Sequence, residues 1–305
     1  MHQSKSPIAI VSDLSKSFDG KKVLNQVTFT VAPGHIVALI GANGAGKTSI
    51  MKALLGLIEI DNGSIQINSE KMTMHSHQSL RNVGAMIEYP SIYPFLTGRQ
   101  QLLLFASGPK RLEQVQTIIE ALGMTAYIDR AAKSYSLGMK QKLGIAQAMV
   151  NQPKLVILDE PMNGLDPQAI KLLRDFIDQQ AQSGTSFLIS SHILSELGKL
   201  ADEFLILDKG NIIRTGTLKA ITSNQVCSYQ VETSDDLCAY KLLVAQQIPV
   251  IDTDPLTFEV SSPDVLTGAV LSIVKANLKL IEITRHEPDL EQIFLKTITT
   301  EEIRG

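Results

Sequence analysis

The feature that most constrains this chain is the segment GANGAGKT at positions 41 to 48, which fits the phosphate-binding pattern G-x-x-x-x-G-K-[ST]. Glycines in such a loop allow successive backbone N–H groups to point inward at an anion. Lys47 is then placed to neutralise the outer phosphates, and the hydroxyl of Thr48 to bind Mg²⁺. The predicted nucleotide-binding residues of the loop are Gly41, Ala42, Asn43, Gly44, Ala45, Gly46, Lys47 and Thr48.

The residues on either side of this loop predict a strand before it and a helix after it. HIVALI is a short, β-branched apolar run, and TSIMKALLGLI places apolar residues at helical spacing. A dinucleotide-binding fold requires G-x-G-x-x-G after its first strand and an acidic residue about twenty positions on. That pattern does not follow the first strand here. The loop therefore predicts phosphoryl chemistry on a nucleoside triphosphate.

Length, charge and hydropathy narrow the class of protein further. At 305 residues the chain is long enough for two domains and a large core. Its formal net charge of -3 gives no general attraction to nucleic acid or anionic lipid, so no nucleic-acid partner is expected. The longest apolar stretches fall far short of the ~20 residues that span a bilayer, and the N-terminus lacks an apolar signal core. We therefore expect a soluble, cytosolic subunit whose membrane-spanning partner, if one exists, is another polypeptide.

Hydrophobic periodicity divides the chain into successive regions. Residues 8–40 are rich in strands, residues 84–150 become helical, and strands then alternate with helices up to about residue 217. Such alternation predicts a parallel sheet covered by helices. The remainder reads as a small α+β unit, suited to packing or dimerisation, that ends in a helix over DLEQIFLKTI. The predicted domains are a P-loop α/β domain over residues 1–220 and an accessory α+β domain over residues 221–305.

Two helices carry local signals of their own. One apolar face is predicted from Val115, Ile118, Ile119 and Leu122, with Gly123 as the C-terminal cap. Further along, Asp166 is placed to cap a helix that has Pro167 in its first turn.

A buried strand, LVIL, ends in the acidic pair Asp159 and Glu160. This places two carboxylates at the C-terminal edge of the sheet, where α/β proteins bind their ligands. One carboxylate can hold Mg²⁺ while the other orients a water molecule. Because a metal that bridges nucleotide phosphates needs an acidic partner, the pair and the phosphate loop together predict one site.

Three segments, YSLGMKQKL, LVILDEPMNGLDP and SSH, resemble the ATP-binding subunits of ABC transporters, and the resemblance covers residues 8 to about 217. It implies an ABC-type nucleotide-binding domain with a helical subdomain, which hydrolyses ATP with Mg²⁺. Residues 41–48 match the family's Walker A loop and residues 155–159 its Walker B strand. The resemblance implies that Glu160 is the general base that activates water and that His192 is the switch histidine at the γ-phosphate. With Lys47, these two are the candidate catalytic residues.

Two more positions match residues that the family uses around ATP. Asp166, in NGLDP, matches the D-loop that communicates across the dimer. Phe18, in KSFDG, stands where the family places an aromatic ring that stacks on adenine. A lone phenylalanine between polar residues suits a core position as well, so both interpretations of Phe18 are open.

The signature segment, residues 135–139, departs from the family's LSGGQ, because it reads Tyr-Ser-Leu-Gly-Met. Ser136 and Gly138 are retained, and these positions can offer a hydroxyl and a close backbone amide at a helix N-terminus. In the family this segment reaches the γ-phosphate bound to the opposite subunit. The resemblance therefore implies a dimer with a second copy of the ATP-binding subunit.

A second departure is Glu88, in GAMIEYPSIYPFLTGRQ, where most of the family has a glutamine that senses Mg²⁺ and relays to the membrane subunit. A glutamate there, the variant signature and the C-terminal extension are similar to the subgroup that exports bacitracin or protects producers of lantibiotics. The resemblance makes Glu88 a candidate ligand of ATP and metal. The candidate metal ligands are Thr48, Asp159 and Glu88.

The resemblance favours an ATPase subunit, peripheral at the cytoplasmic face of the cell membrane, that powers a separate integral membrane permease exporting an antimicrobial peptide, a lantibiotic or a drug. A different class is the soluble ABC ATPase that acts on ribosomes or DNA. Such proteins usually carry two cassettes or a long coiled-coil insertion, and this sequence shows neither. A third interpretation is a regulatory nucleotide switch with negligible turnover, against which Glu160 and His192 argue.

Overall fold

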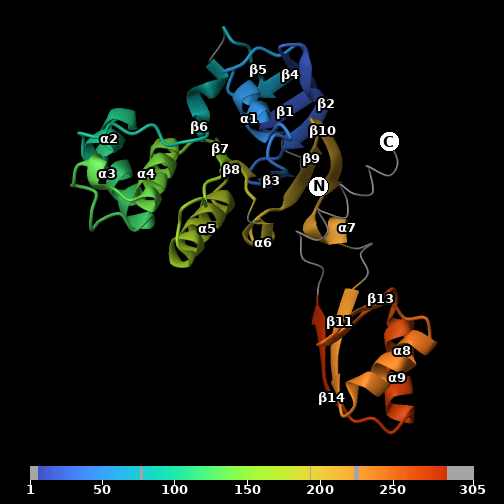
Figure 1. Ribbon diagram of the computed structural model, residues 1–305. Coiled ribbons are helices and arrows are strands. Elements are labelled where there is room, and N and C mark those ends of the chain that lie inside the picture. The colour runs from blue at the N-terminus through green and yellow to red at the C-terminus, as the bar shows by residue number, and fades with distance from the viewer. Residues whose placement is uncertain (1–5, 76–77, 193, 223–226, 287–305) are drawn as a thin grey trace, which may run out of the picture. The chain divides into compact units, whose positions relative to one another are not determined.

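The computed structural model describes residues 6–75, 78–192, 194–222 and 227–286 (Figure 1). The chain divides into two compact units, Met1–Leu218 and Lys219–Gly305. Each unit has a hydrophobic core of its own. Within the described residues, every helix is too short or too polar to cross a membrane.

The first unit begins with an antiparallel sheet whose strands have the order β2-β1-β4-β5. Its two long strands form a hairpin whose turn residues, Asp19 and Gly20, have φ angles of 49° and 77°. Both values lie in the left-handed region that tight hairpin turns require and that glycine adopts without strain. The strands are β1 (Ala9–Phe18), β2 (Lys21–Val31), β4 (Asn62–Ile67) and β5 (Glu70–Lys71).

A second sheet, with the order β10-β9-β3-β8-β7-β6, shares a hydrophobic core with the first. Its strands are parallel except β10, which pairs antiparallel to β9. Strands β7 and β8 are buried along their whole length, as expected of apolar runs covered on both faces. The predicted parallel sheet is confirmed. The strands are β3 (Ile36–Gly41), β6 (Val83–Met86), β7 (Leu155–Asp159), β8 (Ser186–Ser190), β9 (Glu203–Asp208) and β10 (Asn211–Gly216).

The helices that accompany these sheets include α5 (Pro167–Gln182), whose start the sequence predicted. The Asp166 carboxylate accepts a hydrogen bond from Ala169 N at 2.8 Å, and Pro167 occupies the first turn, so this cap is confirmed. The other helical segments of the first unit are α1 (Lys47–Leu54), η1 (Gln78–Asn82) and α6 (Leu194–Leu197). Helix α7 (Leu218–Thr222) spans the boundary between the two units.

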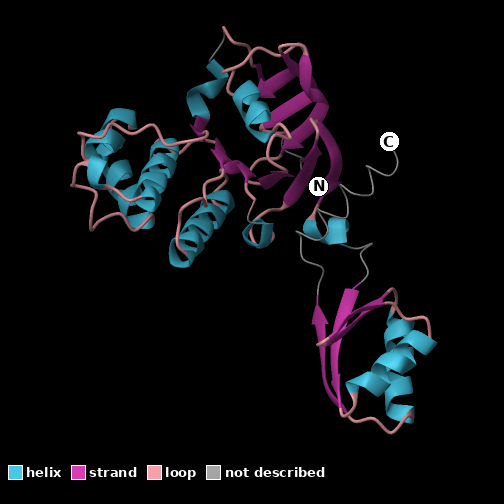
Figure 2. Cartoon of the chain, viewed as in Figure 1, coloured by secondary structure: helices cyan, strands magenta, loops and turns pink. Residues whose placement is uncertain are grey.

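A separate group of helices, set apart from the sheets in Figure 2, consists of α2 (Gly98–Phe105), α3 (Arg111–Ala121), η2 (Ala132–Ser134) and α4 (Leu137–Met149). The four predicted apolar residues of α3 and its end are all buried. Gly123 has a φ of 62° and its N–H bonds to the Glu120 carbonyl, so it caps α3 as predicted. This group is the helical subdomain that the ABC resemblance implied.

The second unit is an antiparallel sheet with the order β12-β13-β11-β14 and both helices on one face (Figure 1). Its element order, β-α-β-β-α-β, is that of a split βαβ fold. The core between sheet and helices centres on Phe258, Leu243 and Ile273. The elements are β11 (Cys227–Thr233), α8 (Asp236–Ala245), β12 (Val250–Thr253), β13 (Leu256–Val260), α9 (Pro263–Lys275) and β14 (Leu280–His286). The helix predicted over residues 289–298 lies outside the described residues.

Candidate functional site

The phosphate loop joins buried strand β3 to helix α1 and is held open by glycines. Gly44 and Gly46 have φ angles of 82° and 112°, which side chains other than glycine rarely adopt. A Cβ at Gly46 would lie 2.7 Å from a methyl carbon of Leu24, and a Cβ at Gly41 would lie 2.7 Å from the Leu207 carbonyl oxygen. The loop therefore combines positive φ with tight packing. Helix α1 begins within it, at Lys47, with Gly46 as its N-cap, so the free N–H groups of the helix N-terminus belong to the loop.

Lys47 is the charged group of this loop, and it is buried. Its Nζ donates to the carbonyl oxygens of Gly41 at 2.7 Å and Ala42 at 3.2 Å. A buried ammonium group needs such partners, because its desolvation is otherwise unfavourable. The lysine is thereby held at the loop, next to a pocket of about 360 Å³. The pocket is lined by Phe18, Asn43, Lys47, Thr48, Asp159 and Glu160, among others.

A second polar cluster joins α1 to the ends of β7 and β8. The Thr48 hydroxyl donates to Asp159 Oδ2 at 2.8 Å, and the Ser190 hydroxyl donates to Asp159 Oδ1 at 2.6 Å. Ser190 Oγ in turn accepts the backbone N–H of Glu160 at 2.9 Å. Both oxygens of the buried aspartate are therefore engaged, and Ser190 connects the two acidic residues.

Glu160 lies at the mouth of the same pocket and contacts His192. Glu160 Oε2 is 2.8 Å from His192 Nδ1 and accepts the His192 backbone N–H at 3.2 Å. The Glu160 side chain is 21% exposed and that of His192 is 62% exposed. Buried Gln141, on α4, donates from Nε2 to the Glu160 carbonyl oxygen at 3.1 Å. The predicted acid and histidine thus meet, and α4 reaches the backbone of Glu160.

Phe18, at the end of β1, lines the pocket and is 42% exposed, so it is no part of the core. Lys16 Nζ lies 5.1 Å from the centre of its ring, within cation–π range. Asp61 accepts from Lys16 Nζ at 3.3 Å and from the Ser17 N–H at 2.6 Å. Desolvation raises the pKa of Asp61, but the hydrogen bonds from Ser17 and the contact with Lys16 together outweigh it, so the pKa of this carboxyl lies below its usual value. One face of the Phe18 ring is therefore occupied by a cation.

The signature segment stands at the start of α4, where Ser136 is the N-cap and accepts the Met139 N–H at 3.3 Å. A Cβ at Gly138 would lie 3.0 Å from the Gly164 carbonyl oxygen, so this turn packs closely on the loop before α5. Asp166 follows that loop with its carboxylate committed to the α5 cap. In the described residues, neither Ser136, Gly138 nor Asp166 lines the pocket of the phosphate loop. The chain therefore holds two separate groups of predicted site residues.

Glu88 follows β6 at a φ of 61° and forms an ion pair with Lys52, which lies on α1 (2.6 Å). Glu88 does not line the described pocket either. Four residues of this region escaped the sequence analysis: Ser190, Gln141, Lys52 and Asp61. Two of them had a local signal: Ser190 belongs to the SSH segment that ends in His192, and Gln141 belongs to the segment YSLGMKQKL.

Comparisons with known proteins agree with this architecture. The family model described as "ABC transporter" matches residues 24–163. The chain is similar to the ABC transporter ATP-binding protein YdbJ of Bacillus subtilis, with 34% identity over 302 residues and 98% of both chains covered. It is 32% identical to the bacitracin transport ATP-binding protein BcrA of Bacillus licheniformis, covering 96% of this chain and 98% of that protein.

Two further similarities cover a smaller share of this chain. The lantibiotic transport ATP-binding protein SrtF of Streptococcus pyogenes is 40% identical over 204 residues, which cover 67% of this chain and 88% of SrtF. A solved structure of the ATP-binding subunit of an ABC transporter is 34% identical with a TM-score of 0.67, covering 71% of this chain and 92% of that one.

Proposed function

The chain belongs to the ATP-binding proteins of ABC transporters, and we propose that it powers the export of an antimicrobial peptide, a lantibiotic or a drug through a separate membrane permease. Members of this family bind and hydrolyse ATP to drive transport, work with permease partners and dimerise. The observation that carries the hydrolytic part is the contact of Glu160 with His192 at the mouth of the phosphate-loop pocket. The exported class is supported by similarity to the bacitracin and lantibiotic transport proteins.

In the proposed mechanism, the phosphate loop binds the outer phosphates through backbone N–H groups and Lys47. Lys47 Nζ then exchanges the carbonyl oxygens of Gly41 and Ala42 for phosphate oxygens, a short movement because both lie in the same loop. Glu160 takes the proton of the attacking water, and His192, 2.8 Å from its carboxylate, orients that base and faces the γ-phosphate. Phe18 stacks on the adenine with the face that Lys16 leaves free.

The oxygens of Thr48 and Asp159 fit Mg²⁺, because a hydroxyl and a carboxylate 2.8 Å apart are the kinds of ligand this ion prefers. When bound, the ion supplies charge neutralisation at the β- and γ-phosphates. Ser190 keeps the Asp159 carboxylate oriented toward Thr48. Glu88 is proposed to join this site only after it leaves Lys52, since the two are paired at 2.6 Å.

Ser136 and Gly138 are proposed to complete the ATP site of a second copy, and Asp166 to lie along the same interface. Two observations support this. The N-terminus of α4, where Ser136 stands, is suited to an anion. In the described residues it does not line this chain's own phosphate pocket, so its proposed ligand is the ATP of the partner copy. The N-terminus of a helix alone binds anions weakly. In the proposed dimer, the phosphate loop of the partner copy supplies the remaining contacts to the same ATP.

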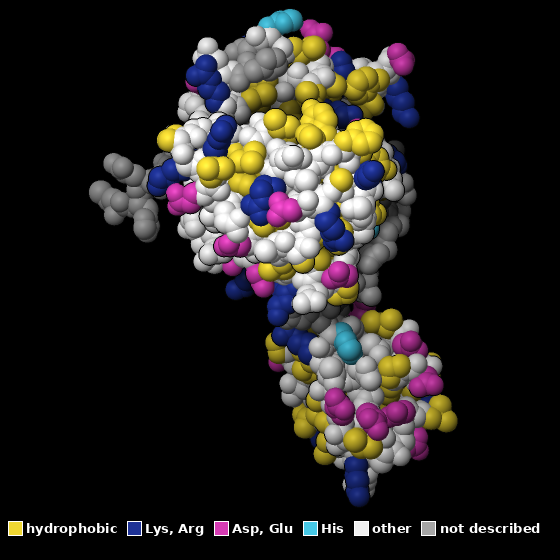
Figure 3. Space-filling model, turned by 90° about the vertical axis from the view of Figure 1, so that its left-hand side faces the viewer, with side chains coloured by type: hydrophobic (Ala, Val, Ile, Leu, Met, Phe, Trp, Pro, Cys, Tyr) yellow, Lys and Arg dark blue, Asp and Glu magenta, His cyan; other side chains and the backbone are white. Residues whose placement is uncertain are grey.

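The proposed permease contact is a groove of about 350 Å³ beside β6 and α4. Tyr89, Pro90 and Ser91 line this groove, and they begin residues 89–96, which we call the aromatic loop. Tyr89 is 83% exposed, and Phe95, farther along the loop and outside the groove lining, is 81% exposed. The face of the first unit that carries α2, α3 and α4 also shows clusters of exposed hydrophobic side chains (Figure 3). Large exposed aromatics around a groove are typical of a protein interface. We propose that this contact holds the subunit at the cytoplasmic face of the membrane.

The experiment that tests the proposal is purification of the tagged chain from membranes in a mild detergent, with identification of the proteins that co-elute and measurement of ATPase activity. We expect an integral membrane protein and a turnover that differs from that of the isolated subunit. Phe95→Ser, a variant outside the ATP site, should lose the membrane partner and retain ATP binding. Co-elution of ribosomal proteins or DNA in place of a membrane protein contradicts the transport role.

A further inference from the structure

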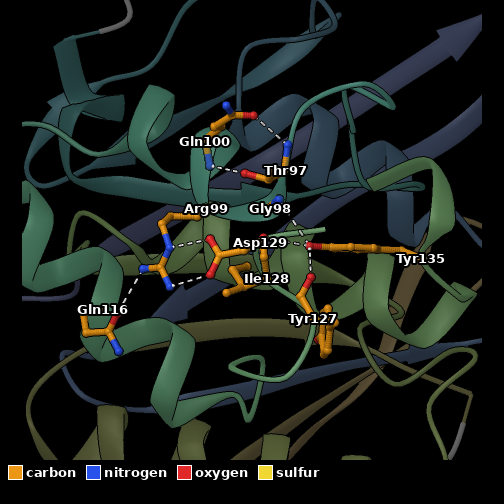
Figure 4. Close-up of polar contacts among 9 residues, drawn as sticks. All are labelled: Thr97, Gly98, Arg99, Gln100, Gln116, Tyr127, Ile128, Asp129 and Tyr135. Carbon is orange, nitrogen blue, oxygen red and sulfur yellow. Dashed lines mark hydrogen bonds and ion pairs between the residues drawn. The ribbon is translucent and has the colours of Figure 1, made fainter. Parts of the chain in front are cut away.

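Tyr135, the first residue of the signature segment, is buried and bonded through its hydroxyl to two other segments (Figure 4). The Tyr135 Oη accepts the backbone N–H of Gly98 at 3.2 Å. It lies 3.0 Å from the carbonyl oxygen of Tyr127 and 3.1 Å from that of Ile128, so its one proton is donated between them. A leucine, which the family's LSGGQ places here, has no such hydroxyl. The departure from LSGGQ therefore adds a three-way polar contact.

The residues around this hydroxyl are fitted to it. A Cβ at Gly98 would lie 2.6 Å from Tyr135 Oη and 2.6 Å from Ile128 Cδ1, so only glycine fits beside the tyrosine. Arg99 binds the Asp129 carboxylate with two nitrogens, at 2.7 and 3.2 Å. These fork contacts, drawn in Figure 4, hold the start of α2 against the loop that accepts the Tyr135 proton. Burial raises the pKa of the Tyr135 hydroxyl, which keeps it protonated and able to donate.

The same region is joined to the aromatic loop by main-chain bonds. Ala132 N donates to the Leu96 carbonyl at 2.9 Å, and Lys133 N donates to the Pro94 carbonyl at 2.8 Å. Thr97 and Ala131 form an isolated β-bridge. The aromatic loop is therefore attached to the three residues that lead into Tyr135 and Ser136.

We propose that Tyr135 is a positioning residue that couples the aromatic loop to Ser136, so that a permease bound at the loop sets the position of the signature segment. The inference rests on the proposed function, because it assumes a permease at the loop and a second copy at Ser136. The hydroxyl binds Gly98, two residues beyond the aromatic loop, and the carbonyl oxygens of residues 127 and 128. Without it, the signature segment loses this attachment to the start of α2, and the main-chain bonds of Ala132 and Lys133 to the aromatic loop remain. The signature turn then gains freedom relative to α2, and its approach to the partner's ATP is less favourable.

The chain offers a matched control in Tyr127. Its ring packs edge-on against Tyr135, with centroids 5.1 Å apart and planes at 90°. Within the described residues, its buried hydroxyl has no hydrogen-bond partner. Tyr127→Phe and Tyr135→Phe therefore remove the same atom from the same aromatic pair, and only the second removes the bonded hydroxyl.

The first test uses the full-length isolated subunit in a Glu160→Gln background, in which we expect ATP-bound dimers to accumulate. The affinity for MgATP, the dimer dissociation constant in MgATP and the Tm are measured for both variants. We expect Tyr135→Phe to weaken the dimer by about tenfold, the scale of one buried hydrogen bond, with MgATP affinity of the monomer unchanged. Tyr127→Phe should leave the dimer constant unchanged. If Tyr135→Phe does not fold, Asp129→Asn, which loosens the same loop at an exposed position, should weaken the dimer in the same direction.

The second test uses the chain with its wild-type Glu160, purified as a complex with its membrane protein. The ATP turnover of this complex is compared with that of the isolated subunit. We expect the ratio of the two rates to fall toward one in Tyr135→Phe and to stay at the wild-type value in Tyr127→Phe. Equal dimer constants and equal ratios for the two variants overturn the proposal for Tyr135. A wild-type ratio of one contradicts the permease coupling instead, and the dimer measurement then decides the role of Tyr135 by itself.

Discussion

The two units bury different kinds of side chain. In the described residues the first unit buries nine polar or charged side chains, and the second buries one, Thr233. Thr233 bonds locally to Asp236 at the start of α8 (2.8 Å), which is a structural contact. In the first unit, Lys47, Asp159 and Ser190 are buried around the phosphate-loop pocket. Because buried polar groups are unfavourable unless partnered, the gathering of these three at one pocket indicates ligand binding in the first unit. The described part of the second unit has no comparable group.

Among the variants that test this contrast between the units, we expect the largest loss of ATP turnover from a change at Glu160, which lines the pocket. Glu160→Gln keeps the side-chain size and removes the base, so ATP turnover should fall by about 10² to 10⁴ while ATP still binds. A coupled phosphate-release assay and size-exclusion chromatography with saturating MgATP measure the two quantities. Wild-type turnover, or a variant that stays monomeric with ATP, would show that Glu160 is not the base of a closing dimer.

Lys47 should give the next largest effect. Lys47→Ala removes the only side-chain charge of the loop, and MgATP affinity should fall by about 100-fold, the scale of a charge-assisted hydrogen bond. Isothermal titration with MgATP measures it. Lys52→Ala, on the same helix and outside the pocket, is the control and should bind within twofold of wild type. Equal affinities for Lys47→Ala and wild type contradict the site.

Ser190 and Ser186 allow a closer test, because both are buried on β8. Ser190→Ala leaves Asp159 and the Glu160 N–H short of a partner, and turnover should fall by about tenfold. Ser186 Oγ instead accepts the Gly34 N–H at 2.9 Å, remote from the pocket, so Ser186→Ala should lower the Tm and leave turnover unchanged. If both variants lose turnover equally, the effect of Ser190 is only stability.

Glu88 is expected to give a smaller effect. Glu88→Gln removes a partly exposed ion pair, so stability and ATP affinity should change little, while the coupled turnover of the membrane complex shifts by about threefold. Lys52→Gln removes the same ion pair and keeps the carboxylate. An equal shift in both variants assigns the effect to the ion pair. A shift in Glu88→Gln alone assigns it to the carboxylate.

The smallest effect on ATP should come from the second unit. Phe258→Ala opens the centre of its core and should destabilise that unit by about 3–5 kcal/mol. MgATP affinity should remain within twofold of wild type, because the residues that line the phosphate-loop pocket all belong to the first unit. Hydrogen exchange and ATP titration on the full chain report the two effects. If the variant loses ATP binding while its first unit stays protected from hydrogen exchange, ATP binding does not depend on the first unit alone.

The sequence predicted best what is encoded by local spacing. The phosphate loop, the Walker B strand, the Asp166 cap and the apolar face of α3 each depend on residues a few positions apart, so periodicity and turn chemistry identify them. Contacts between distant residues could not be predicted this way. Ser190 and Asp159 are 31 positions apart, Lys52 and Glu88 are 36, and Gly98 and Tyr135 are 37. These pairs come into contact only when the strands and helices pack together, so no local sequence pattern predicts them.

The backbone of Glu160 has a further consequence. Its φ of 50° lies in a region that residues other than glycine rarely adopt. Three hydrogen bonds hold it there: the Glu160 N–H donates to Ser190 Oγ, and the Glu160 carbonyl accepts from Gln141 Nε2 and from Asn163 N. Selection for thermal robustness alone therefore favours glycine at this position, where it also removes the carboxylate. Laboratory evolution toward a more thermostable subunit will therefore meet a trade-off at position 160: the residue that relieves the backbone strain there lacks the carboxylate proposed for ATP hydrolysis.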